Sequence, residues 1–220
     1  MSKPIRMLIG ILLLTFLTSC SKGSIDFLNN SICEAPCWRG IDMGTSKESA
    51  IDMLRTMTDV DDASIQVTQV HRPFFEEELH WRFENSEEVG SMALNNKKVN
   101  QMYFPLKKQL TLSRLIELYG QPDALIIRKT KFEGTSIKVY FLYQNRGICL
   151  VHQPSVFLFS DPITYKINSN IHISEVHYAD HTIDNWQVSL ACGGGFEIDE
   201  YTSAIQEWKG YSDYQISPSN

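Results

Sequence analysis

The N-terminal apolar run determines which part of the chain is available to fold. Residues 7–17 are almost entirely apolar, and Lys3 and Arg6 stand before them. A helix that spans a bilayer needs about 20 apolar residues, whereas the apolar core of a cleaved export signal has roughly 7–15. We therefore predict that residues 1–19 are a signal peptide and that the rest of the chain folds outside the cytoplasm.

A cysteine ends this predicted signal. Thr18 and Ser19 lead directly to Cys20, and small residues before a cysteine at this place resemble the bacterial lipoprotein signal. The resemblance implies that the Cys20 thiol receives acyl chains such as palmitate and that the mature chain begins there. The expected location is the cell membrane or outer membrane, on the extracytoplasmic side. An ordinary secretory signal with an incidental cysteine is the alternative. Residues 20–32 are mostly polar and are expected to be a tether.

The charge of the chain limits its partners. The formal net charge is −6, and removal of Lys3 and Arg6 with the signal would make it more negative. An acidic chain is a poor ligand for nucleic acid or for anionic lipid headgroups. We expect membrane attachment through the lipid alone, and no nucleic-acid partner.

Four cysteines follow Cys20, and an even number in an exported chain favours disulfides. They are Cys33, Cys37, Cys149 and Cys192. Three connectivities are possible, and we favour the pairs Cys33–Cys37 and Cys149–Cys192. A zinc site at Cys33 and Cys37 is the alternative, but the second closely spaced pair of thiolates is missing. We therefore expect no metal and no cofactor.

The hydrophobic pattern predicts a helix followed by an antiparallel meander, twice. Residues 45–48 have the form of a capping box, and apolar residues recur at helical spacing over residues 46–57. Alternation and turn residues then predict strands over 64–71, 80–83, 89–94 and 99–104. A second helical stripe covers 112–119 and ends at Gly120, with strands predicted over 124–129, 137–143, 148–153, 156–159, 163–167 and 171–178. We predict an α+β fold of two tandem helix-plus-sheet units, residues 33–110 and 111–182.

The C-terminal segment, residues 183–220, is expected to add one helix. Tyr201, Ala204, Ile205 and Trp208 recur at helical spacing. The three glycines at 193–195 lack the Lys and Ser/Thr of a phosphate-binding loop, and we interpret them as a connection.

Three short motifs resemble known envelope proteins. Residues 40–48, which lead into the first predicted helix, look like the entry of the small BamE-like lipoproteins, whose tandem copies make the beta-lactamase inhibitor protein fold. Residues 119–123, Tyr-Gly-Gln-Pro-Asp, look like the exit from the helix in the same superfamily. Residues 33–41 are similar to uncharacterised bacterial lipoproteins with a C-x-x-P-C-W-x-G-I opening. Met43 stands where those proteins usually have Pro. The resemblance implies the tandem fold and an envelope location, and it implies no activity.

Two groups of residues carry candidate chemistry. His177, Asp180 and His181 lie near the end of one predicted strand, His172 lies at its start, and all four are metal-ligand types. Alternation along a strand puts His172 and His177 on opposite faces, which favours solvated side chains over a metal site. Cys149 and His152 have the residue types of a thiol nucleophile and its base, but they also fall on opposite faces.

Two acidic clusters complete the candidates. Asp59, Asp61 and Asp62 offer carboxylates, but the glycine and the twelfth-position Glu of a calcium loop are absent. Phe74 and Phe75 precede a run of three glutamates, and we select them with Trp81 as a candidate contact site. The alternative is that both Phe side chains lie in the core.

We expect a lipid-anchored protein-binding or scaffold domain, and not an enzyme. An antiparallel sheet covered by helices on one side leaves its other face to a protein partner. The alternative function is an exported enzyme, or a carrier of a small ligand or metal, that uses His172, His177, Asp180 and His181.

Overall fold

The computed structural model describes residues 36–72, 75–84, 86–130, 136–154, 164–182 and 203–216. All of them belong to one compact unit, residues 31–220. The predicted signal and tether, Cys20, Cys33, Cys192 and the glycines at 193–195 lie outside the described residues. The elements are α2 (Lys47–Thr56), β1 (Val60–Arg72), β2 (Phe75–Phe83), β3 (Val89–Asn95), β4 (Lys98–Thr111), α3 (Leu112–Tyr119), β5 (Ala124–Thr130), β6 (Ser136–Tyr143), the 3₁₀ turn η1 (Gln144–Arg146), β7 (Ile148–His152), β8 (Thr164–Lys166), β9 (His172–Ala179), β10 (Gln206–Glu207) and β11 (Asp213–Gln215).

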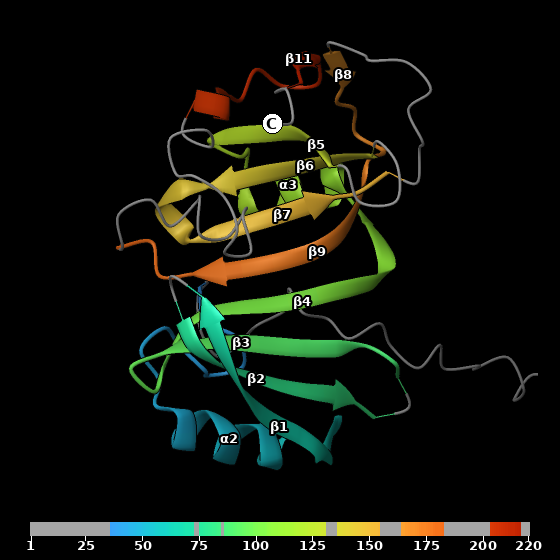
Figure 1. The fold of residues 1–220 in the computed structure, drawn as a ribbon. Coiled ribbons are helices and arrows are strands. Elements are labelled where there is room, and N and C mark those ends of the chain that lie inside the picture. The colour runs from blue at the N-terminus through green and yellow to red at the C-terminus, as the bar shows by residue number, and fades with distance from the viewer. Residues whose placement is uncertain are drawn as a thin grey trace, which may run out of the picture. The chain divides into compact units, whose positions relative to one another are not determined.

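Nine of these strands form one sheet, in the order β1-β2-β3-β4-β9-β7-β6-β5-β10 (Figure 1). Every neighbouring pair in it is antiparallel. Strands β8 and β11 form a separate two-stranded sheet. The two sides of the large sheet meet where β4 pairs with β9, so that Met102 faces Tyr178 and Tyr103 faces His177.

The predicted α+β fold of two tandem helix-plus-sheet units with a C-terminal helix is wrong. The β4–β9 ladder joins strands of residues 33–110 and 111–182 into one continuous antiparallel sheet. Among the described residues, α2 and α3 are short and most of the chain is extended. Periodicity located the two helices before residue 120 and most of the predicted strands, whereas the strand predicted over 156–159 lies outside the described residues. Periodicity does not say which distant strands pair.

The predicted C-terminal helix is also wrong. Gln206 and Glu207 are extended and pair with Leu125 and Ala124 on β5, as strand β10. Just before them, Ala204 belongs to a buried cluster with residues of β5, β6, β7 and β9, and Ile205 packs against that cluster. Of the residues that the helical spacing selected, Ala204 is buried, Ile205 and Trp208 are partly buried, and Tyr201 lies outside the described residues. The strand pairing of Gln206 and Glu207 overrides the local helical propensity here.

The two helices lie on one face of the sheet, which we call the helix face. Lys47 of α2 bonds to Glu77 on β2 at 2.9 Å, and the ring of Tyr119 on α3 lies 6.0 Å from that of Tyr143 on β6. Side chains alternate along strands, so cross-strand neighbours share a face. One buried row on this face consists of Leu79, Met92, Met102, Tyr178, Ile148 and Tyr143. The opposite face is called the pocket face.

Side chains at both helix starts accept hydrogen bonds from the backbone. The Ser46 hydroxyl accepts from the Ser49 amide at 3.2 Å and caps α2. Thr45, the cap expected from the sequence, instead accepts from the Asp42 amide at 2.9 Å in the preceding turn. In α3, Thr111 is the cap and Gly120 ends the helix with φ of 80°, at the predicted place.

The segment before α2 is held by a tight turn. Trp38 and Ile41 exchange two backbone hydrogen bonds of 2.9 Å, and the residues between them, Arg39 and Gly40, have φ of 51° and 89°. Two positive φ angles are the geometry of a two-residue hairpin turn, which glycine adopts without strain. Both Trp38 and Ile41 are fully buried. The W-x-G-I motif is therefore a structural feature of the fold.

Trp38 enters an aromatic cluster on the helix face. Its ring lies 5.5 Å from that of Trp81 on β2 and 4.8 Å from that of Phe104 on β4. The Arg39 guanidinium fixes the turn through two bonds to the Asp59 carboxylate, at 2.6 and 2.9 Å. Trp81 is 0% exposed and belongs to this core, so its selection as a surface contact residue was wrong.

Gly90 gives the first testable prediction. It faces Trp81 across β2 and β3, and a Cβ at Gly90 would overlap the Trp81 ring. We expect Gly90→Ala to lower the free energy of unfolding by about 1–3 kcal/mol, measured by chemical denaturation. In a Trp81→Leu background the same substitution should cost much less, because the overlapping ring is gone. Equal costs in both backgrounds would contradict this explanation.

Candidate functional site

One row of side chains crosses the pocket face and changes character along its length. His80 on β2, Ser91 on β3, Tyr103 on β4 and His177 on β9 are successive cross-strand partners. The row continues from His177 through Cys149, Leu142 and Ala124. It is therefore polar over β2, β3, β4 and β9 and apolar over β7, β6 and β5.

The apolar part of the pocket face is covered. The buried cluster there consists of Ala124, Ile126, Tyr140, Leu142, Cys149, Val151, Ala179 and Ala204. Ala204, with Ile205 beside it, comes from the C-terminal segment. This part of the face is core and offers no surface to a ligand.

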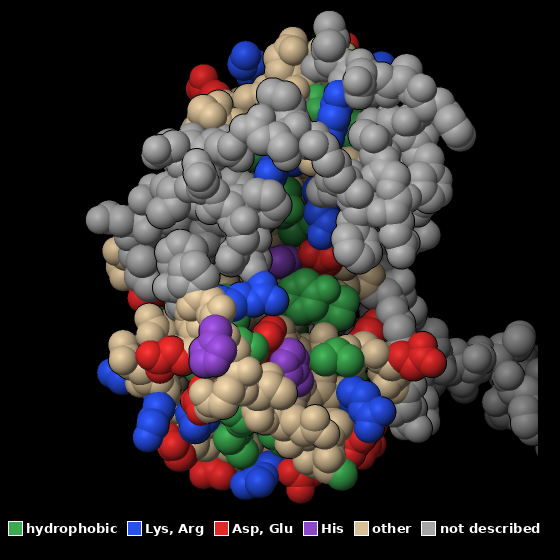
Figure 2. Space-filling view, in the orientation of Figure 1, with side chains coloured by type: hydrophobic (Ala, Val, Ile, Leu, Met, Phe, Trp, Pro, Cys, Tyr) green, Lys and Arg blue, Asp and Glu red, His purple; other side chains and the backbone are tan. Residues whose placement is uncertain are grey.

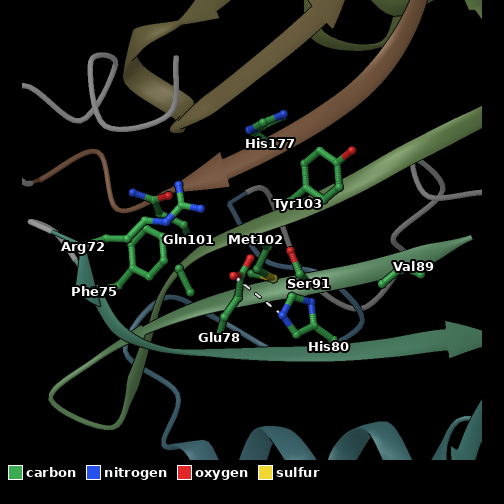
Figure 3. Close-up of a pocket in the computed structure, with 11 residues that line it drawn as sticks. Arg72, Phe75, Glu78, His80, Val89, Ser91, Gln101, Met102, Tyr103 and His177 are labelled. Atoms are coloured by element: carbon green, nitrogen blue, oxygen red, sulfur yellow. Dashed lines mark ion pairs between the residues drawn. The ribbon is translucent and has the colours of Figure 1, made fainter. Parts of the chain in front are cut away.

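The polar part of the pocket face contains a pocket of about 390 Å³ (Figure 3). The residues that line it are Arg72, Phe75, Glu78, His80, Val89, Ser91, Ala93, Gln101, Met102, Tyr103 and His177. Figure 2 shows histidine side chains among acidic and basic ones on this side of the molecule. Mostly apolar walls with a few convergent polar groups are typical of ligand-binding pockets.

The end of the β1–β2 hairpin forms one wall. The register of β1 against β2 shifts between Asp61 and Gln66 and again between Gln69 and Arg72. Such bulges increase strand twist, and in Figure 1 β1 runs obliquely over its neighbours. Arg72 and Phe75 thereby reach the pocket, with the guanidinium carbon 5.8 Å from the Phe75 ring centroid (Figure 3).

Two histidine–glutamate pairs face the pocket region. His80 Nε2 lies 3.6 Å from Glu78 Oε2, and His177 Nε2 lies 3.1 Å from Glu175 Oε2. Both pairs come from the same local pattern, Glu-x-His on a strand, in which residues two apart share a face. This repeated pattern is the sequence signal that marks the site, and the predicted site residues include only His177 of the four.

Tyr103 lies between Ser91 and His177 in the pocket row. Its ring contacts the His177 ring edge-to-face, with centroids 4.9 Å apart. Burial raises the pKa of the Tyr103 hydroxyl to about 12, and the nearby Glu175 charge adds to the shift. Tyr103 is thus a neutral hydrogen-bonding group at any physiological pH.

Glu175 is held in its ionised form. Its burial opposes ionisation, but the hydrogen bond from His177 and the charges of His177 and Lys138 outweigh burial and lower the pKa of the carboxyl. The Lys138 ammonium lies 4.0 Å from Glu175 Oε1. A negative charge therefore stands beside the pocket row at neutral pH.

The residues weighed as an alternative metal site do not come together. His172 and His181 are exposed, and Asp180 accepts hydrogen bonds from Thr182. Only His177 of the four lines the pocket. No group of three or more His, Cys, Asp or Glu residues in the described ranges has the arrangement of a metal site.

The predicted contact residues divide between pocket and core. Phe75 is 8% exposed and lines the pocket, while Phe74 lies outside the described residues. The glutamates after them belong to strand β2 and not to a loop. Glu77 bonds to Lys47 on the helix face, whereas Glu78 points to the pocket face.

The bonding state of Cys149 differs from the predicted disulfide. Cys149 is a free and fully buried thiol, so the disulfide Cys149–Cys192 is not formed. Burial, with a contribution from Glu175, raises the pKa of this thiol far above its usual value, and a protonated thiol is a poor nucleophile. Cys37 is disulfide-bonded to a residue outside the described ranges, so the pairing with Cys33 stays a prediction.

His152 is not a base for Cys149. Its Nδ1 lies 2.7 Å from the His172 carbonyl oxygen and its Nε2 lies 2.9 Å from the Tyr165 hydroxyl. Burial lowers the pKa of His152, more than the bond to His172 raises it. The side chain connects β7 to β8.

The acidic cluster before β1 and in its first residues has basic partners. Asp59 bonds to Arg39 at 2.6 Å, Asp61 lies 3.5 Å from an Arg82 nitrogen, and Asp62 lies 3.2 Å from Arg55. Each carboxylate of this cluster thus has a basic partner in the chain, so the cluster does not point to a calcium site.

The Glu175–His177 pair gives the second prediction. We expect His177→Gln to raise the pKa of Glu175, because burial then acts without the histidine charge. We expect His80→Gln to leave the pKa of Glu175 unchanged. Carboxyl NMR titration measures both.

The pair stabilises the fold above the pKa of an unfolded glutamate, about 4.3, and the contribution disappears as pH falls through the lower folded value. The stability difference between wild type and His177→Gln should shrink over that pH range; a constant difference would contradict the assignment.

In the part of the chain that the structure describes, every helix is too short or too polar to cross a membrane. The comparisons with known proteins identified no protein that is similar to this chain. No family model, no curated protein and no solved structure matches this chain.

Proposed function

We propose that this chain is a lipid-anchored protein of the bacterial cell envelope that binds a protein partner through the polar part of its pocket face. The observation that carries the proposal is the pocket itself, where four sheet strands and the β1–β2 hairpin bring aromatic, imidazole, hydroxyl and carboxylate groups to one hollow. Interface anchors are typically aromatic or charged side chains seated in such pockets.

The contacts among the pocket residues favour recognition over catalysis. His177 bonds to Glu175 and contacts Tyr103, so this part of the site is fixed by its neighbours. Fixed polar groups cost little entropy when a partner binds, which favours affinity. The nearest thiol in the row, Cys149, is buried under Ala204 and Ile205 and is protonated.

The N-terminal signal supports the location in this proposal. Acyl chains on Cys20 would hold the domain at the membrane surface, since each buried CH₂ contributes about 0.8 kcal/mol and several chains together hold a protein stably. A polar tether over residues 20–32 would let the sheet stand in water, where a partner can reach the pocket face.

The third prediction tests the binding face by site-specific cross-linking in cells. A photo-reactive amino acid at Val89, which lines the pocket and is 40% exposed, should form a discrete covalent product with one protein. The matched control is Leu118 on α3, which is 43% exposed and does not line the pocket. Products of equal yield at both positions, or none at Val89, would overturn the assignment of the binding face.

The fourth prediction tests the anchor. Cys20→Ala should abolish incorporation of labelled palmitate and move the protein from the membrane fraction to the soluble fraction, because the acylated thiol is gone. Cys149→Ala is the control and should leave labelling unchanged, since that thiol is buried. Palmitate retained by Cys20→Ala would refute the lipoprotein assignment.

A further inference from the structure

Some groups around the pocket are charged at neutral pH, whereas the histidines are charged only when protonated. Glu78 lines the pocket, and Glu175 stands beside it, next to His177. Glu78 pairs with His80 and Glu175 with His177, and histidine carries charge only when protonated. Arg72 adds a permanent positive charge to the lining. Lys138 offsets part of the Glu175 charge from 4.0 Å. The Glu78 carboxylate therefore faces the pocket with a partner that is neutral when its imidazole is deprotonated.

The pocket walls add two aromatic rings. Phe75 is on the hairpin side and Tyr103 is on the sheet side (Figure 3). The face of an aromatic ring attracts a cation within about 6 Å of its centroid. Rings together with a carboxylate provide both attractive elements for a guanidinium or ammonium group.

Arg72 already shows this preference at the pocket edge. Its guanidinium carbon lies 5.8 Å from the Phe75 ring centroid. A cation supplied by the chain itself is thus tolerated against one of the pocket rings. For an incoming cation, Arg72 is a competitor for that ring and a source of like-charge repulsion.

We propose that the pocket receives a lysine or arginine side chain of the protein partner, with Glu78 as its counter-ion and Phe75 and Tyr103 as its ring contacts. The inference rests on the proposed function and adds the chemistry of the partner. The net charge of −6 agrees with it, since an acidic protein attracts basic partners over long distances and speeds their association.

The experiment titrates the protein with short blocked peptides and follows it by NMR. Four probes share the form Ac-Gly-X-Gly-NH₂, where X is lysine, arginine, Nε-acetyl-lysine or glutamate. We expect the lysine and arginine peptides to shift signals of Tyr103 and His80, and the acetylated and acidic peptides to bind at least tenfold more weakly. The acetylated peptide keeps the length of lysine and removes only its charge.

Two substitutions should change binding of the lysine peptide in opposite directions. Glu78→Gln should weaken binding of the lysine peptide about tenfold, because a charged hydrogen bond is lost. Arg72→Ala should strengthen it about two- to threefold, because a competing cation is removed. The matched controls are Glu117→Gln and Arg55→Ala, which change net charge equally on α3 and α2. Circular dichroism checks that every variant keeps its fold.

The outcomes separate this inference from the proposed function. Preference for the glutamate peptide, equal binding of lysine and acetyl-lysine, or weaker binding in Arg72→Ala would overturn the cationic occupant. Absence of binding by all four peptides would overturn it as well. The proposed function is then decided on its own by the cross-linking yield at Val89, which requires no assumption about charge.

Discussion

The ladder between β4 and β9 is the contact on which the rest of this structure depends. It pairs residues 101–105 with residues 175–179 and so joins strands that lie far apart in the sequence. The same ladder places Tyr103 beside His177, which brings the two histidine–glutamate pairs to one face. Sheet continuity and site geometry thus have one cause. Without this pairing, each set of strands would expose an edge.

The pocket face is divided by chemistry along one row of cross-strand partners. Over β5, β6 and β7 the row is apolar, and the C-terminal segment buries it. Over β2, β3 and β4 the row is polar, and the hairpin end with Arg72 and Phe75 encloses a pocket instead. The helix face shows no such division, because α2, α3 and the Trp38 turn cover core side chains along it. One face of the sheet therefore combines a buried core with an open pocket.

Sequence patterns predicted most elements and little of their arrangement. The first helix was expected at 46–57 and is found at Lys47–Thr56, because capping and apolar spacing are local signals. Most strands were also located, since alternation is local, although β2 begins at Phe75, earlier than the predicted 80–83. The fold class and the C-terminal helix were not, because β4–β9 and β10–β5 pairing depend on long-range contacts. In the site, Phe75 and His177 were selected, and Glu78 was noted only as one of the glutamates after Phe75. His80 and Tyr103 were not selected, since only the strand register shows that these residues converge.

Cys149 has a consequence for how this sheet moves. The Cys149 thiol is fully buried in the cluster that includes Ala204 and against which Ile205 packs, so it reaches solvent when this packing opens locally. Its alkylation by a water-soluble maleimide would therefore occur at the frequency of that local opening and not at the intrinsic rate of the reagent. The alkylation rate of Cys149 therefore reports how often the core opens next to His177, its cross-strand partner in the pocket row.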